Sequence, residues 1–325
     1  TEDRQAAEAK LAKYRADLVD GLPSDRMDWT PQEQVSELVW QLLDFHHRAD
    51  KPGWWSLFAR MDMTHDELID DAECLGQLTL DPACPPYLDK KSTVYTYVVP
   101  EQDSKLADGS SCTRADTAKS VGVVQLDEAS RRASLRVGPG KEPLPPMLSL
   151  GPTGPIDTKG IVAALYRFAD SMLVESGAYL ALKRFLLREQ PALTGRLSGQ
   201  PIIEPGQDTV AGSIAAVQAL DQSYLYVQGP PGAGKTYTGS RMIVSLLQQG
   251  KRVAIMSNSH KAINNLLEGV MKVQAGMGLS HRAVKKCSRG NEDSECHDER
   301  FLIENIADNA EVYGSLAPLV AGTVW

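Results

Sequence analysis

The stretch VQGPPGAGKT at residues 227–236 decides how the rest of the chain is interpreted. Gly229, Gly234, Lys235 and Thr236 satisfy the spacing GxxxxGK[ST], which is typical of loops that hold nucleotide phosphates. Residues 223–227 (SYLYV) predict a short strand before the loop, and residues 236–249 predict an amphipathic helix after it. Strand, glycine-rich turn and helix in this order predict a P-loop, because glycines let the backbone point its N–H groups inward and the helix N-terminus attracts an anion.

The residue types of the loop suit a nucleoside triphosphate bound together with Mg²⁺. We expect Lys235 to act catalytically by reaching the β- and γ-phosphates, and the Thr236 hydroxyl to bind Mg²⁺ and assist in the reaction. The expected nucleotide-binding residues are Gly229, Pro230, Pro231, Gly232, Ala233, Gly234, Lys235, Thr236 and Tyr237. The motif alone does not separate small-molecule kinases, AAA-type ATPases and helicases, so the flanking sequence must do so.

A second polar segment follows the next predicted strand. Residues 252–256 (RVAIM) predict a strand, and residues 257–267 (SNSHKAINNLL) predict a polar strand end that leads into a helix. Small polar donors at a helix N-terminus can bind phosphate or sugar groups, although a capped αβ unit without a ligand has the same pattern. The alternation of helix and strand in this part of the chain predicts a doubly wound α/β domain with a parallel sheet, and the glycine-rich loop makes it a P-loop NTPase domain.

The preceding residues predict two other kinds of structure. Residues 1–85 predict a helical region, with a capped helix that starts at Thr30, and residues 86–150 predict a small β-barrel. Residues 151–204 predict a helical stalk and connector, and residues 205–325 the N-terminal part of the P-loop domain. Within these regions we expect a Pro/Gly-rich linker over residues 138–155 and a helix over residues 158–188.

Composition and charge restrict the class of protein further. The net charge of -8 excludes a generally basic nucleic-acid coat but permits a local basic groove. One dense basic cluster could be such a groove or a solvated surface: it comprises His281, Arg282, Lys285, Lys286 and Arg289. No apolar run is long enough to cross a membrane, and five irregularly spaced cysteines predict free thiols in the cytoplasm. A start without Met and an end on an apolar strand predict a fragment of a longer protein.

Three segments together resemble a known family. GPPGAGKT, SNSHKAINNLL and the terminal VAGT at residues 320–323 resemble superfamily 1 helicases, in the 1B branch that contains the nonsense-mediated-decay RNA helicase and eukaryotic nuclease-helicases. The pattern is most similar to bacterial proteins that fuse a RecB-like nuclease to such a helicase. The resemblance implies an α/β P-loop NTPase domain of the RecA-like type. It also implies ATP-driven movement of a monomer along a single strand of DNA or RNA, with ATP and Mg²⁺ bound. It implies nucleic-acid contacts by Ser257, Asn258, Ser259, His260, Lys261 and Thr323.

The sequence also departs from the pattern of that family. The glutamine that reads adenine upstream of the loop is replaced by Ala211–Gly212, and the nearest glutamines are Gln207 and Gln218. No apolar strand ending in Asp-Glu (Walker B) follows the loop, so we expect this chain to need the remainder of its helicase and to be inactive alone. Two other hypotheses remain open: a nucleotide-binding switch that carries an interaction module, and a P-loop kinase of small molecules.

Overall fold

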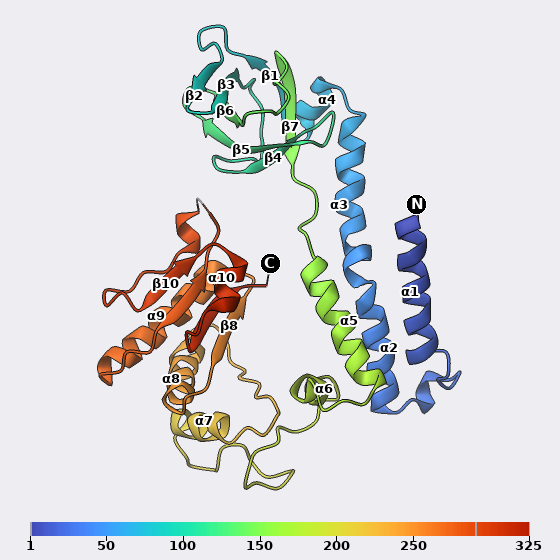
Figure 1. The fold of residues 1–325 in the computed structure, drawn as a ribbon, viewed down its shortest axis with the longest axis vertical. Helices are drawn as coiled ribbons and strands as arrows, with labels where there is room; N and C mark the ends of the chain where they lie inside the picture. Colours follow the sequence, from blue (N-terminus) through green and yellow to red (C-terminus); the bar gives the residue numbers. More distant parts are fainter. Residues whose placement is uncertain (1, 290, 325) are drawn as a thin grey trace. The chain divides into compact units, whose positions relative to one another are not determined.

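The computed structural model describes residues 2–289 and 291–324 of the chain. These residues form two compact units, Thr1–Leu43 with Thr158–Trp325, and Asp44–Asp157 (Figure 1). The first unit therefore comes from two separate stretches of sequence, and the second unit is inserted between them. Among the described residues, none of the helices combines the length and the apolar composition that a bilayer span requires.

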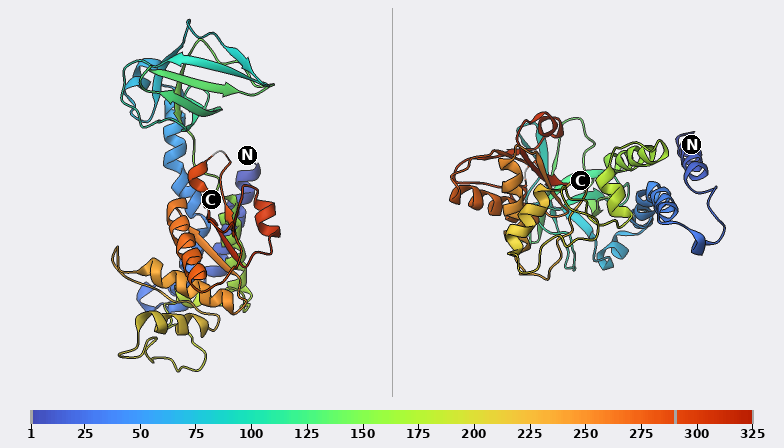
Figure 2. Two further views of the ribbon diagram at one scale, coloured as in Figure 1. Left: turned by 90° about the vertical axis from the view of Figure 1, so that its left-hand side faces the viewer. Right: turned by 90° about the horizontal axis from the view of Figure 1, so that it is seen from below.

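The inserted unit is built around a closed β-barrel, which Figure 2 shows from two further directions. Its strands are β1 (Leu75–Leu80), β2 (Tyr87–Asp89), β3 (Ser92–Val98), β4 (Ser111–Arg114), β5 (Ser120–Asp127), β6 (Arg132–Val137) and β7 (Met147–Pro152). Because β1 pairs with both β7 and β3, six antiparallel strands close in the order β1-β7-β4-β5-β6-β3, and β2 extends β3. Leu78, Tyr97 and Leu135 fill the interior. The predicted small β-barrel is confirmed.

The barrel takes in residues on both sides of the predicted range 86–150. Strand β7 lies within residues 138–155, where a linker was expected, so that expectation is wrong. Prolines and glycines surround β7, but Leu148 and Leu150 bury their side chains in the barrel, and this burial outweighs the turn-forming flanks. Two helices precede the barrel, α3 (Phe45–Met61) and α4 (His65–Asp70), the second of them capped by Thr64.

The first unit begins with a helical layer. It contains α1 (Glu2–Leu18), the 3₁₀ turn η1 (Arg26–Asp28), α2 (Pro31–Leu43), α5 (Lys159–Leu173) and α6 (Leu180–Leu186). Helices α1, α2 and α5 share one apolar core, to which Leu18, Val39 and Phe168 contribute buried side chains. Helix α2 starts as predicted, since the Thr30 N–H donates to the Glu33 carboxylate at 2.7 Å and the Glu33 N–H donates to the Thr30 hydroxyl at 3.3 Å.

The helix expected over residues 158–188 is in fact two helices. Between α5 and α6 the backbone of Glu175 has a φ of 47° and that of Tyr179 a φ of 56°. Both residues are left-handed, which an α-helix of L-residues cannot accommodate. Gly177 between them has little helix propensity. The apolar periodicity extends across the break, and for that reason the sequence pattern alone did not reveal it.

The remaining part of the first unit is an α/β layer. Its elements are α7 (Thr209–Gln218), α8 (Lys235–Gln248), β8 (Val253–Ser257), α9 (His260–Gly276), β9 (Ala283–Lys286), η2 (Glu292–Ser294), β10 (Ile303–Ile306), α10 (Asn309–Gly314) and β11 (Leu319–Thr323). The four strands are parallel in the order β10-β9-β11-β8. Helices α8 and α9 bury Leu247, Ile263 and Leu267 against the sheet. The predicted α/β class is thus confirmed for a four-stranded parallel sheet.

One predicted strand is missing from this sheet. Residues 223–227, which precede the glycine-rich loop, form no strand, and Tyr226 is 74% exposed. Their alternating aromatic and aliphatic residues favour an extended backbone, but a strand also needs a neighbouring edge to pair with. Among the described strands, none pairs with this segment, so the loop is approached by an irregular extended chain.

Candidate nucleotide and nucleic-acid sites

The glycine-rich loop forms a turn that opens directly into helix α8. The Ala233 N–H donates to the Pro230 carbonyl at 3.2 Å, and Gly232 and Gly234 have φ values of 81° and 78°. Both angles are left-handed, so glycine at these two positions lets the backbone turn without strain. Gly234 is also the N-cap of α8 and has no side chain to satisfy the first N–H groups of the helix. These N–H groups therefore remain open to an anionic ligand.

The Lys235 side chain folds back over this turn. Its ammonium donates to the carbonyl of Gly229 at 2.5 Å and to that of Pro230 at 2.8 Å. A Cβ added at Gly229 would lie 3.1 Å from the Ala233 Cβ, so the turn is closed too tightly for a larger residue there. The result is a cationic group close to the uncapped N–H groups at the start of α8, in a turn whose residues 230–236 are exposed to solvent. This arrangement is suited to a polyphosphate.

Thr236 lies in the first turn of α8, with its hydroxyl exposed and without a hydrogen bond to the residues that the structure describes. A free hydroxyl at this place fits a magnesium ion, which takes few ligands from the protein and keeps its phosphate and water oxygens. Within residues 2–289 and 291–324, no group of three or more His, Cys, Asp and Glu side chains could hold a metal ion. Thr236 therefore remains the predicted residue of this chain for an ion that arrives with a nucleotide.

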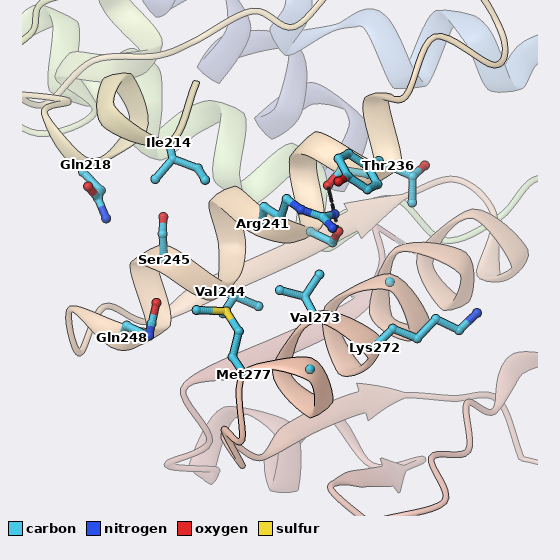
Figure 3. A pocket seen from close by; sticks show the side chains of 14 residues that line it. Ile214, Gln218, Thr236, Arg241, Val244, Ser245, Gln248, Lys272, Val273 and Met277 are labelled. Carbon is cyan, nitrogen blue, oxygen red and sulfur yellow. Dashed lines mark hydrogen bonds between the residues drawn. The ribbon is translucent and has the colours of Figure 1, made fainter. Parts of the chain in front are cut away.

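A groove runs beside Thr236, between helices α7, α8 and α9 (Figure 3). It encloses about 720 Å³, and its walls are mainly apolar, with Ile214, Val244 and Val273 among them. At the end near Thr236, the Arg241 guanidinium lies 3.3 Å from the centre of the Tyr237 ring and donates to the Tyr237 carbonyl at 3.0 Å. Sequence reasoning missed Arg241, although its position one helical turn after Tyr237 predicts that the two side chains meet.

The missing upstream glutamine now has a structural reason. A Cβ at Gly212, in α7, would lie 2.7 Å from the Ile203 Cγ2, so the Ile203 side chain would have to shift to admit a larger residue there. Of the two nearest glutamines, Gln207 lies beside position 212, with its Cδ 3.2 Å from such a Cβ, and accepts from the Glu204 N–H at 3.1 Å. Gln218 lines the groove.

The predicted nucleic-acid contacts come together at the carboxyl ends of two adjacent strands. In the pairing of β8 with β11, Ser257 lies directly opposite Thr323. Ser259 then caps α9, since its hydroxyl accepts from the Ala262 N–H at 3.4 Å. Asn258 and Lys261 are exposed, and His260 is half-buried. The six residues thus form a single edge at which small polar side chains surround the N-terminus of a 17-residue helix.

This edge and the glycine-rich loop belong to the same packed layer. Helix α8 leads into β8 through the short connection after Gln248, and it packs directly against α9. A Cβ added at Gly269 of α9 would meet the Ser240 Cβ at 3.3 Å and the Thr236 Cγ2 at 3.7 Å. Helices α8 and α9 therefore pack with almost no space between them behind Thr236.

The basic cluster predicted at residues 281–289 is not one surface. Arg282 and Arg289 are exposed, but Lys285 is fully buried and bonds to the ring of His260. Burial lowers the pKa of His260, and the charges of Lys285 and Lys286 lower it further. Both expectations for the cluster, a binding patch and a solvated surface, are therefore wrong for Lys285.

Comparison with known proteins supports one class of ATPase. A family model described as an AAA domain matches residues 211–305, a range that includes the loop, α8 and α9. The mouse protein "DNA replication ATP-dependent helicase/nuclease DNA2" is 31% identical over 107 residues, which are 32% of this chain and 10% of that protein. The chain therefore spans about a tenth of the length of this relative. The two matches support a superfamily 1 helicase-like family, in which ATP is the expected ligand of the loop.

Proposed function

We propose that this chain is part of an ATP-dependent helicase or translocase of superfamily 1, which moves along a single strand of DNA or RNA as a monomer. The observation that carries the proposal is the polar edge: the tips of β8 and β11 and the N-terminus of α9 come together at the carboxyl ends of parallel strands, in the same unit as the glycine-rich turn that begins α8. Such an edge is where open α/β sheets bind their ligands. Similarity to a named helicase/nuclease adds support, and we extend the proposal to a RecB-like nuclease-helicase.

In this proposal the turn holds the triphosphate. The N–H groups at the start of α8 would donate to phosphate oxygens. The Lys235 ammonium would leave the Gly229 and Pro230 carbonyls and donate to phosphate oxygens instead. Magnesium, bound with the nucleotide, supplies charge neutralisation, and Thr236 is the residue of this chain that would hold it.

The polar edge holds the strand. Ser257, Ser259, His260 and Thr323 would donate to backbone phosphates, and the exposed Lys261 adds a positive charge. These contacts carry no base information, which is consistent with binding of many sequences. Thr236 lies against α9 at Gly269. In this proposal, a movement of Thr236 on nucleotide binding would therefore displace α9, whose N-terminus lies at the polar edge.

Nucleotide binding by the 325-residue chain tests the first half of the proposal. A fluorescent ATP analogue titrated with Mg²⁺ should bind the unaltered chain, and Lys235→Ala should weaken binding by about tenfold or more. Lys251→Ala is the matched control, because Lys251 is exposed just beyond the other end of α8. Equal binding by both variants and the unaltered chain would overturn the assignment of the loop.

Strand-stimulated ATP hydrolysis and unwinding test the second half, and they need the longest natural form of the protein. DNA and RNA strands are compared at several salt concentrations, since phosphate contacts predict affinity that falls steeply with salt. Nucleotide binding without any response to a strand would favour a nucleotide-dependent switch over a motor.

A further inference from the structure

Lys285 is a cation with an unusual position. It lies on β9 beneath the N-terminus of α9, and its side chain is fully buried. Its nitrogen Nζ lies 2.9 Å from the His260 Nδ1, 2.8 Å from the Lys286 carbonyl oxygen and 2.9 Å from the Ser294 carbonyl oxygen. Within residues 2–289 and 291–324, no carboxylate forms an ion pair with it. Burying a lysine ammonium without a counter-ion lowers the stability of the fold, so a functional role for this charge is expected.

The three partners define the protonation of the pair. An ammonium has three N–H donors, and the two carbonyls can only accept. The third donor therefore requires that the His260 Nδ1 accepts, which places the proton of a neutral imidazole on Nε2. Distances of 2.8–2.9 Å to all three acceptors are typical of charge-assisted bonds. A neutral amine would give the opposite tautomer, with the proton on Nδ1.

The titratable surroundings do not supply a negative charge. Lys286 lies next along β9, and the buried thiols of Cys287 and Cys296 lie near Lys285 from the end of β9 and from the segment after η2. Burial raises the pKa of Cys296 to about 11, so this thiol is neutral at physiological pH. The positive charge of Lys285 thus remains uncompensated beneath the helix N-terminus.

We propose that Lys285 is a positioning residue for strand binding: its buried ammonium holds His260 neutral, with the Nε2–H available as a donor to a phosphate oxygen. A phosphate diester offers acceptors only, so the opposite tautomer would present a lone pair and repel it. The His260 ring is half-buried, and its Nε2 has no hydrogen bond to any residue that the structure describes. The inference rests on the proposed strand contact by His260 and names the residue that prepares it.

The tautomer can be measured without any ligand. In ¹⁵N NMR of the 325-residue chain, the ring nitrogens of His260 are identified by the signals that disappear in His260→Gln, since the chain has six histidines. We expect an unprotonated Nδ1 and a protonated Nε2 from about pH 6 to about pH 8. A proton on Nδ1, or a cationic ring in this interval, overturns the inference.

Strand binding then separates positioning from a merely structural role. Fluorescein-labelled oligo-dT and oligo-U are titrated with the unaltered chain, Lys285→Met and the control Lys251→Met, whose side chain is exposed beyond the end of α8. We expect binding by the unaltered chain and the control to vary little between about pH 5.5 and about pH 8. Lys285→Met removes the ammonium that fixes the tautomer and one of the charges that, after burial, lower the pKa of His260. The ring then protonates more readily at pH 5.5, where both of its nitrogens can donate, so binding should be about tenfold weaker at pH 8 than at pH 5.5.

The outcomes distinguish the two proposals. A loss of affinity in Lys285→Met that does not change with pH, or no loss at all, overturns the positioning role. If Lys285→Met does not fold, the tautomer in the unaltered chain still decides. If Nε2 carries the proton but no oligonucleotide binds, the proposed function is wrong. If oligonucleotides bind but the proton is on Nδ1, only the positioning role of Lys285 is wrong.

Discussion

Two glycines at opposite ends of α8 provide a matched test of the nucleotide site. Gly234, with φ of 78°, begins the helix, and Gly250, with φ of 72°, follows its end. A Cβ added to either glycine would meet nothing within 4 Å, so alanine at either position costs backbone strain and not a clash. That strain is about 1–2 kcal/mol for a left-handed residue with a Cβ.

The strain has different consequences at the two ends. In Gly234→Ala the turn can relieve it only by rotating the N–H groups that would face the phosphates. A loss of about 1–2 kcal/mol corresponds to affinity for the ATP analogue that is about 5-fold to 30-fold lower. In Gly250→Ala the same strain falls on the C-terminal cap, where the Gly250 N–H donates to the Leu247 carbonyl at 2.9 Å. Thermal stability should drop there by a few degrees, with affinity unchanged.

Isothermal titration calorimetry of both variants with the ATP analogue and Mg²⁺ measures the affinities, and differential scanning fluorimetry measures Tm. Equal affinities for Gly234→Ala and the unaltered chain would refute the claim that these N–H groups bind phosphate. Equal losses in both variants would show instead that strain anywhere along α8 disturbs the site, and the loop would have no special role.

Three further predictions concern stability and turnover. Leu267→Ala should destabilise the first unit by about 2–5 kcal/mol, because this leucine is fully buried between α9 and the sheet. Urea unfolding measures the free energy of unfolding, and a loss below about 1 kcal/mol would contradict this packing. Asp71→Asn should cost the barrel unit about 1–3 kcal/mol at pH 7, since Arg60 donates to this carboxylate at 2.7 Å. The same bond lowers the pKa of Asp71, so its contribution to the free energy of unfolding is present above about pH 4 and is lost as the pH falls through the lowered pKa. The urea midpoints of Asp71→Asn and the unaltered chain, measured from about pH 7 to about pH 2, must therefore converge at low pH. The 325-residue chain should bind ATP but hydrolyse it negligibly, because no described strand after the glycine-rich loop ends in an Asp-Glu pair. Strand-stimulated phosphate release would disprove this.

The sequence predicted the structure well where it depends on neighbouring residues, and less well where it depends on pairing between distant segments. The turn and the start of α8 depend on residues 229–236 alone, so the motif predicts their geometry. Residues 223–227 have the composition of a strand, but no neighbouring edge pairs with them, and a single sequence does not show where such edges lie. Strand β7 was missed for the opposite reason: its pairing with β1 and β4 overrides turn-forming flanks.

Lys285 shows where a finer signal was present in the sequence. Adjacent lysines at residues 285–286 resemble a solvated surface, but side chains on a strand alternate between the two faces. Ala283 and Cys287 are apolar residues two positions before and after Lys285, and both are buried. Period-two spacing therefore places Lys285 on the covered face and Lys286 on the other. Its partner His260 is far away in the sequence, so the pair itself could only be found in the fold.

The rigidity of the strand edge follows from the same contacts. The segment after β9 is joined to α9 by Asn264, which donates to the Glu295 carbonyl at 2.7 Å, and to β9 by Lys285, which donates to the Ser294 carbonyl. The glycine-rich turn is instead closed by its own residues, since Lys235 donates to the Gly229 and Pro230 carbonyls. Helices α8 and α9 meet where Thr236 and Ser240 lie against Gly269. We therefore expect any effect of a ligand at the turn on α9 to pass through this contact.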